Sequence, residues 1–176
     1  HPHVSQNGKI AVVHNGIIEN YLEIREFLQE KGVQFTSQTD SEVVAQLMEY
    51  CMGLPEVSTV SDALYMVLHR IEGAYALGIL CSDDPDHIYA ARKDAPLLLG
   101  FGKGENFIAS DVTALVSHTK NVVYLDDGEL AEVRADSYTV FDCTGKPIEK
   151  PVSRVAWDIE AAEKGGYEHF MLKEIM

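Results

Sequence analysis

The chain has 176 residues, 46% of them hydrophobic, which suits one globular domain with a sizeable core. Its 28 acidic and 14 basic residues give a formal net charge of −14, so no basic stripe is present to neutralise phosphates. Nucleic acids and anionic membrane surfaces are therefore poor partners. No apolar run reaches the roughly 18 residues of a membrane span, and the first residues lack a secretory pattern, so we expect a cytoplasmic location.

The beginning of the chain predicts a strand, a helix and a second, shorter strand. Residues 9–14 form an apolar run typical of a buried strand. Residues 20–31 carry apolar side chains at helical spacing and stop before Gly32, a common residue after a helix end. Residues 33–36 alternate between apolar and polar side chains, which favours a short strand.

Two more helices are predicted in the middle of the chain. Thr39 and Glu42 have the spacing of a capping box, so a helix is expected to begin there and to end near Gly53. A third helix is expected to follow Thr59 and to be closed by Gly73. The side chains predicted to face the core from the three helices are Tyr21, Ile24, Phe27, Leu28, Val43, Val44, Leu47, Met48, Val60, Leu64, Val67, Leu68 and Ile71.

The second half of the chain changes to the period of β-strands. We expect strands over residues 74–81, 87–92, 97–101, 106–109, 122–125, 129–134 and 138–141, and a short helix over 111–117 capped by Ser110 or Asp111. The first four of these strands are predicted to form a meander. Helices first and strands later, without βαβ alternation, predict an α+β sandwich of antiparallel sheets rather than a doubly wound parallel sheet.

The last residues of the chain differ in character from the rest. Residues 159–164 are expected to form a short acidic helix, followed by a two-glycine hinge. Residues 167–176 carry apolar side chains typical of a segment that docks onto another surface. We therefore divide the chain into a domain of residues 1–156 and a linker segment of residues 157–176.

An apolar strand that stops at Asn15 and Gly16 combines a side-chain amide with an unhindered backbone N–H. Both donors can face one point, which is what a developing oxyanion requires. Gly16 lacks Cβ, so a substrate can approach its backbone closely. The alternative is a two-residue hairpin turn, for which Asn-Gly is the commonest signal. Because a helical pattern follows, we expect a corner between a strand and a helix and identify Asn15 and Gly16 as candidate oxyanion-hole residues.

Asp40, at the expected start of the second helix, is a candidate receptor for the ammonium group of a substrate. The alternative is an acidic residue in the first helical turn that only complements the helix dipole. Both interpretations place a negative charge at the helix N-terminus. Neither interpretation of Asp40 supplies a nucleophile, and no candidate nucleophile lies next to Asn15, Gly16 or Asp40 in the sequence.

The three cysteines, Cys51, Cys81 and Cys143, have no close partner in sequence, which favours reduced thiols over a disulfide framework. Nothing near them in sequence lowers the pKa of a thiol. We therefore expect inert side chains and no internal nucleophile.

Histidines His1 and His3, together with His14, are a minimal set of imidazole ligands for a metal ion. No cysteine or carboxylate joins them at ligand spacing. We therefore expect no metal site and no cofactor, and the roles of these three histidines stay open.

Six segments of the chain together resemble a known family. They are residues 1–3, 13–20, 39–43, 72–76, 109–111 and 164–175. In order and spacing they are similar to the glutaminase domain of the isomerizing glutamine–fructose-6-phosphate aminotransferases, the glucosamine-6-phosphate synthases, which are class II glutamine amidotransferases. The likeness covers essentially the whole chain. The last segment is the most specific, because the segments around Asn15 and Asp40 are shared across the superfamily.

The resemblance implies a fold and a site. The family fold is the N-terminal-nucleophile αββα sandwich. Asn15 and Gly16 would form the oxyanion hole. Gly16 and Asp40 would both contact glutamine, and Asp40 would hold its α-ammonium group. In the family the nucleophile is a cysteine at the first position, whose own amine serves as base, and an upstream arginine binds the carboxylate. Both lie outside the printed sequence, so we expect a fold incomplete at its N-terminus and a chain inactive alone.

The resemblance also implies partners. Ammonia released from glutamine would pass to a C-terminal isomerase domain that acts on fructose 6-phosphate in hexosamine synthesis, and the full-length protein would be a homodimer. Two alternatives stay open: the glutaminase domain of an amidophosphoribosyltransferase-like enzyme, and a non-catalytic module that binds a partner. The segment of residues 164–175 argues against the first.

Overall fold

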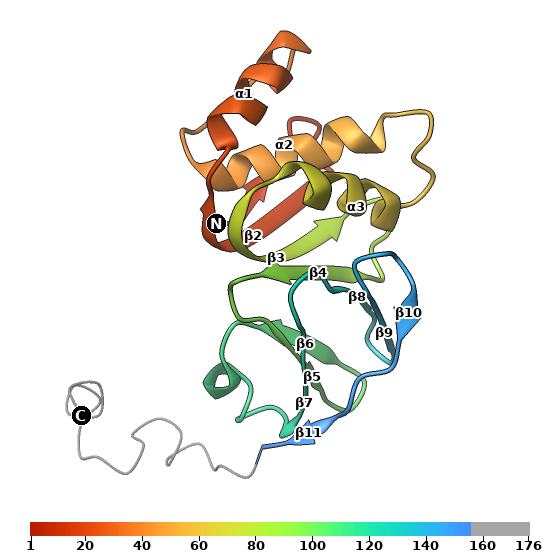
Figure 1. The fold of residues 1–176 in the computed structure, drawn as a ribbon. Coiled ribbons are helices and arrows are strands. Elements are labelled where there is room, and N and C mark those ends of the chain that lie inside the picture. The colour runs from red at the N-terminus through yellow and green to blue at the C-terminus, as the bar shows by residue number, and fades with distance from the viewer. Residues whose placement is uncertain (156–176) are drawn as a thin grey trace, which may run out of the picture.

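A computed structural model describes residues 1–155 of the chain. These residues form two antiparallel sheets, and the three α-helices lie on one face of the larger sheet (Figure 1). Residues 156–176 lie outside the described residues, so the short helix expected over 159–164 and the docking segment expected over 167–176 are not tested. None of the helices between residues 1 and 155 is long and apolar enough to cross a membrane.

All strand pairs within the two sheets are antiparallel. The larger sheet contains, in spatial order, β1 (His3–Val4), β2 (Ile10–Ile18), β3 (Gly73–Cys81), β4 (Ile88–Lys93), β8 (Leu130–Val133), β9 (Tyr138–Phe141) and β10 (Pro147–Ile148). The smaller sheet contains β11 (Ser153–Arg154), β7 (Asn121–Tyr124), β5 (Leu98–Phe101) and β6 (Asn106–Ala109). The predicted α+β sandwich of antiparallel sheets is confirmed.

The helices are α1 (Tyr21–Glu30), α2 (Asp40–Met52), α3 (Val60–Arg70) and the 3₁₀ turn η1 (Val112–Ala114). Helices α2 and α3 begin at the predicted caps, where the Thr39 and Thr59 hydroxyls accept from the backbone N–H groups three residues on. Asp111 caps η1 by accepting from Thr113 N at 2.9 Å. Local cap chemistry therefore sets where these elements begin.

Two cores hold the layers together. The first lies between the helices and the larger sheet and includes fully buried Leu28, Leu47 and Leu64. The second joins residues of both sheets, among them Leu99 and Leu125. All thirteen side chains predicted to face the core from the helices belong to the first core or pack against it, which confirms the helical periodicity.

Two predictions about local structure are wrong. Residues 33–36 form a loop rather than a strand. Their N–H groups bond elsewhere than to a strand: Val33 N donates to Leu28 O of α1, Gln34 N to the Gln6 side chain, and Thr36 N to Glu42 of α2. The four-strand meander also fails: β3 and β4 pair in the larger sheet, whereas β5 and β6 pair in the smaller one. A local pattern of strands and turns carries no information about which sheet each strand joins.

The predicted corner at Asn15 and Gly16 is a further correction, and the hairpin alternative fails with it. Strand β2 continues through both residues to Ile18 and pairs with β3 along its whole length. Gly16 has a φ of +114°, and a Cβ there would lie 2.2 Å from the Ala74 carbonyl oxygen. Gly73, which opens β3 instead of closing α3, has a φ of +120°, and its Cβ would lie 2.2 Å from the Ile17 carbonyl oxygen. Gly16 and Gly73 each face a backbone carbonyl of the opposite strand. Because residues with a Cβ rarely adopt these backbone angles, the two strands can stay paired here only with glycine at both positions.

We expect Gly73→Ala to lower the free energy of unfolding by about 4 kcal/mol or more, because the new methyl group meets a backbone carbonyl that cannot move aside cheaply. Gly32→Ala is the matched control, since Gly32 also has a positive φ but open space around it. That variant should lose only about 1–2 kcal/mol, the cost of the left-handed conformation. Denaturant unfolding of both variants measures the difference, and equal losses would contradict the steric argument.

Candidate functional site

Strand β2 presents two different faces. Val12, His14 and Ile18 are buried beneath the helices, whereas Val13 and Ile17, on the opposite face, are 46% and 66% exposed. Successive side chains of a strand point to opposite faces, so Asn15 points the same way as Val13 and Ile17. The Asn15 amide is therefore directed away from the helical layer, toward the smaller sheet.

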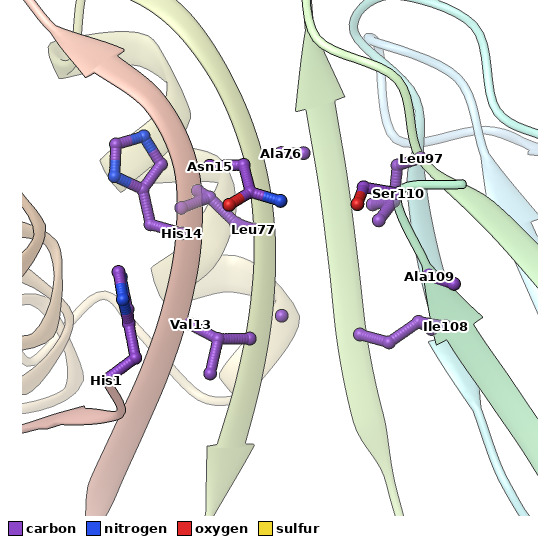
Figure 2. A pocket seen from close by; sticks show the side chains of 11 residues that line it. His1, Val13, His14, Asn15, Ala76, Leu77, Leu97, Ile108, Ala109 and Ser110 are labelled. Atoms are coloured by element: carbon purple, nitrogen blue, oxygen red, sulfur yellow. The ribbon is translucent and has the colours of Figure 1, made fainter. Parts of the chain in front are cut away.

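A cavity of about 290 Å³ lies between the two sheets in front of Asn15. Figure 2 shows the Asn15 side chain reaching into this space from β2, with Ser110, which follows β6, on the opposite side. The remaining lining residues are mostly apolar: His1, Val13, His14, Ala76, Leu77, Gly78, Leu97, Ile108 and Ala109. Asn15 is itself exposed, so its amide is accessible to a ligand that enters this mostly apolar cavity.

The register of β2 against β3 directs the Gly16 N–H away from β3, toward the other edge of β2. Glu19 N donates to Glu72 O at 2.8 Å, so the odd-numbered residues of β2 exchange hydrogen bonds with β3 and the even-numbered ones point the other way. Ile18 follows this rule, because its N–H points away from β3 and donates to Asp40 Oδ2 at 2.8 Å. Strand β1 pairs with β2 only at positions 11 and 12, so it does not cover the edge at Gly16.

Asp40 is brought to the same edge by the start of α2. Its Oδ2 accepts from Ile18 N, two residues beyond Gly16 on β2. Residues two apart on a strand lie about 7 Å from each other, a span that one amino acid can bridge. The structure therefore places Asn15, Gly16 and Asp40 around one end of β2: Asn15 in the cavity, and Gly16 and Asp40 on the adjoining edge.

His14 lies between these groups and beneath α2. The side chain is 6% exposed, and its Nδ1 is 2.9 Å from the Ser41 hydroxyl. Burial lowers the pKa of His14, although the nearby Asp40 carboxylate opposes this effect. His3, whose Nε2 is 3.4 Å from Thr39 Oγ1, also lies close by.

His1 and His3 stack edge to face with ring centroids 5.1 Å apart. Across residues 1–155, no three side chains of His, Cys, Asp or Glu gather as they would around a metal ion.

Comparison with known proteins gives a family for this arrangement. Residues 1–117, which carry Asn15, Gly16 and Asp40, match the model of the glutamine amidotransferase domain. The chain belongs to this family.

Among curated amidotransferase relatives, an isomerizing glutamine–fructose-6-phosphate aminotransferase from Caldanaerobacter subterraneus subsp. tengcongensis is 58% identical over 175 residues, covering 99% of this chain and 28% of that protein. The enzyme of the same name from Methanosarcina acetivorans is 50% identical over 182 residues, covering 99% of this chain and 29% of that protein. The chain thus spans less than a third of the length of these relatives.

A solved glutamine phosphoribosylpyrophosphate amidotransferase from B. subtilis, complexed with ADP and GMP, has a TM-score of 0.60 at 23% identity, over 90% of this chain and 32% of that one. At this identity the likeness concerns the fold alone. It agrees with the N-terminal-nucleophile sandwich that the sequence resemblance implied.

The cysteines of this amidotransferase domain lie away from the site. Cys51 and Cys81 are buried, and Cys143 is exposed. Burial raises the pKa of the Cys51 thiol, which keeps it protonated. Cys51 lies on the buried face of α2, within the first core, as suits the inert side chain that the sequence predicts.

Glu42 lies in the site region, and the sequence pattern assigned it only to a capping box. Its carboxylate, 1% exposed, accepts from Ser37 N at 2.6 Å and from Thr36 N at 2.9 Å, and it also bonds the Ser37 hydroxyl and the Gln46 amide. Burial by itself would raise the pKa of Glu42, but the hydrogen bonds from Ser37, Thr36 and Gln46 outweigh it, so the pKa lies below its ordinary value. This buried carboxylate holds the loop that leads into Thr39 and Asp40. The Thr-x-x-Glu spacing indicated a helix cap, but it did not predict that Glu42 would bond the loop residues Thr36 and Ser37.

We expect Glu42→Gln to lower the free energy of unfolding by about 2 kcal/mol at pH 7, because the amide cannot accept from all the buried donors of the loop. The folded-state pKa of Glu42 is depressed, so its contribution is present above the ordinary pKa of a glutamate and is lost as pH falls through the lower folded-state pKa. The variant should therefore differ most from the native chain at neutral pH and least in acid. Chemical unfolding at pH 7 and near pH 3 measures this, with exposed Glu26→Gln on α1 as control; a pH-independent difference would contradict the assignment.

Proposed function

We propose that the chain is the glutamine-hydrolysing part of an isomerizing glutamine–fructose-6-phosphate aminotransferase, which releases ammonia from glutamine for transfer to fructose 6-phosphate. The single observation that carries the proposal is the meeting of Asn15, Gly16 and Asp40 at one end of β2. Two hydrogen-bond donors and one carboxylate at this spacing suit the two ends of glutamine. The curated relatives at 45–58% identity bear this enzyme's name.

In this proposal the Asn15 amide and the Gly16 N–H donate to the oxyanion that forms when the glutamine amide carbon is attacked. Donors held in place before the reaction stabilise such a charge without reorganising at the moment it forms. The Asp40 carboxylate pairs with the α-ammonium group, which aligns the amide with the donors. The attacking thiol would be the first-position cysteine of the family, outside the printed sequence, and its thioester is then hydrolysed by water.

We also propose the context of the domain. Residues 1–156 form the glutaminase domain, and residues 157–176 lead toward a sugar isomerase domain of a cytoplasmic homodimer. The length of the relatives, of which the chain spans 28–29%, supports the further domain. The amidophosphoribosyltransferase alternative is supported by two solved structures at 23–24% identity. That likeness concerns the fold, which does not specify the molecule that accepts the ammonia. The non-catalytic alternative predicts that the full-length protein releases no glutamate from glutamine.

We expect Asn15→Ala in the full-length protein to lower the turnover number for glutamine hydrolysis about 10²- to 10³-fold, with little change in KM, because the lost donor acts on the transition state. Steady-state release of glutamate measures both constants. Asn121→Ala, at an exposed position of β7, is the control and should keep native activity. Unchanged turnover in the Asn15 variant would refute its role in the oxyanion hole.

We expect Asp40→Asn to raise KM for glutamine about 10- to 100-fold, because the ammonium group loses its charged partner while Ile18 N keeps an acceptor. Competitive inhibition by glutamate should weaken by a similar factor. Asp136→Asn, at an exposed turn, serves as control. A native KM in the Asp40 variant would show that another group binds the ammonium.

A further inference from the structure

We infer that the hydrogen bond between His14 and Ser41 is a positioning contact, which sets the spacing between the oxyanion donors on β2 and the ammonium-binding Asp40 on α2. The inference rests on the proposed function and adds two residues to it. Neither side chain would touch glutamine. Both would act through the relative placement of the two elements that do.

Two contacts join β2 to the first turn of α2, and they bracket Gly16. On one side, His14 Nδ1 meets the Ser41 hydroxyl at 2.9 Å. On the other side, Ile18 N donates to Asp40 Oδ2 at 2.8 Å. Since Asp40 and Ser41 are consecutive and Gly16 lies midway between His14 and Ile18, the pair of contacts defines both the distance and the direction from the glycine to the carboxylate.

The Ile18 contact alone cannot do this, because it uses the same carboxylate that binds substrate. When the ammonium group approaches, Asp40 has to share its charge between Ile18 N and the ligand. The His14–Ser41 contact is separate from the ligand and buried, with both residues below 7% exposure. It therefore keeps α2 in place on β2 while Asp40 changes partners.

The surroundings of the ring favour its neutral form, in which one nitrogen donates and the other accepts. Burial is the main cause of the lowered pKa. The Asp40 carboxylate of α2 and the backbone of Ala74 on β3 oppose it, and His3 of β1 adds to it. Within the described part of the chain, His14 Nε2 is buried without a hydrogen-bond partner. The contact with Ser41 is thus the ring's one polar tie to a neighbouring side chain among these residues.

A matched pair of serines tests the inference in the full-length protein. Ser41 and Ser61 occupy the same position of two helices, the second residue after the capping threonine. The Ser61 hydroxyl bonds Glu132, far from Asp40 in the fold. Ser41→Ala removes the proposed contact, Ser41→Thr retains a hydroxyl, and Ser61→Ala removes an equivalent helix-start contact elsewhere.

The readout compares glutamine with 4-carbamoylbutanoate, which has the same amide and carboxylate but no ammonium group. We expect Ser41→Ala to lower kcat/KM for glutamine about tenfold, the effect of one misplaced polar contact, and to leave the value for 4-carbamoylbutanoate within about twofold. Ser41→Thr should restore the native value, and Ser61→Ala should change neither substrate. In an Asp40→Asn background, Ser41→Ala should have no further effect, because the group it positions is already lost.

The outcomes separate the inference from the proposed function. Equal losses for both substrates in Ser41→Ala, or no loss for either, overturn the positioning role while native turnover and the Asp40→Asn effect stand. Additive losses in the double variant overturn it as well. If the native protein fails to hydrolyse glutamine, the proposed function itself fails and the positioning role falls with it. If Asp40→Asn leaves the KM for glutamine unchanged, another group binds the ammonium, and the positioning role is overturned while glutamine hydrolysis stands.

Discussion

The close approach of β2 and β3 at two glycines is the constraint on which the site depends. Gly16 and Gly73 each adopt a positive φ and each face a carbonyl oxygen of the opposite strand, at a distance that excludes a Cβ. Because both positions are glycine, the strands stay paired as far as Ile18. Continued pairing fixes which backbone N–H groups face outward, and so it makes Gly16 and Ile18 donors on one edge.

The first turns of α2 concentrate the buried polar groups of the domain beside that edge. Ser41, Glu42 and Gln46 are all buried. Ser41 bonds His14, Gln46 bonds Glu42, and the last two also accept from backbone N–H groups of neighbouring loops. A buried carboxylate is tolerated only where several donors surround it. Glu42 meets this condition by organising the loop before the helix, and the result is a rigid approach to Asp40.

Sequence patterns predicted the helices well and the strand partners poorly. The caps at Thr39 and Thr59 and the apolar spacing of the helices are local features, and the structure confirms them. The Asn15–Gly16 pair was a weak guide to backbone shape, because its strongest local association is with a turn. The partner that keeps it in a strand, β3, begins more than fifty residues later in the chain.

Taken alone, the residues determined the fold class, the starts of α2 and α3, the core-facing side chains of the helices and which residues are candidates for the site. Tertiary structure decided that Asn15 faces the space between the sheets, that Asp40 reaches the strand edge at Ile18, and that His14 meets Ser41. Helix starts depend on contacts three residues apart, which the order of residues encodes directly. Site geometry depends on contacts between segments 22 to 27 residues apart and on the register of β2 against β3, which only the packed chain defines.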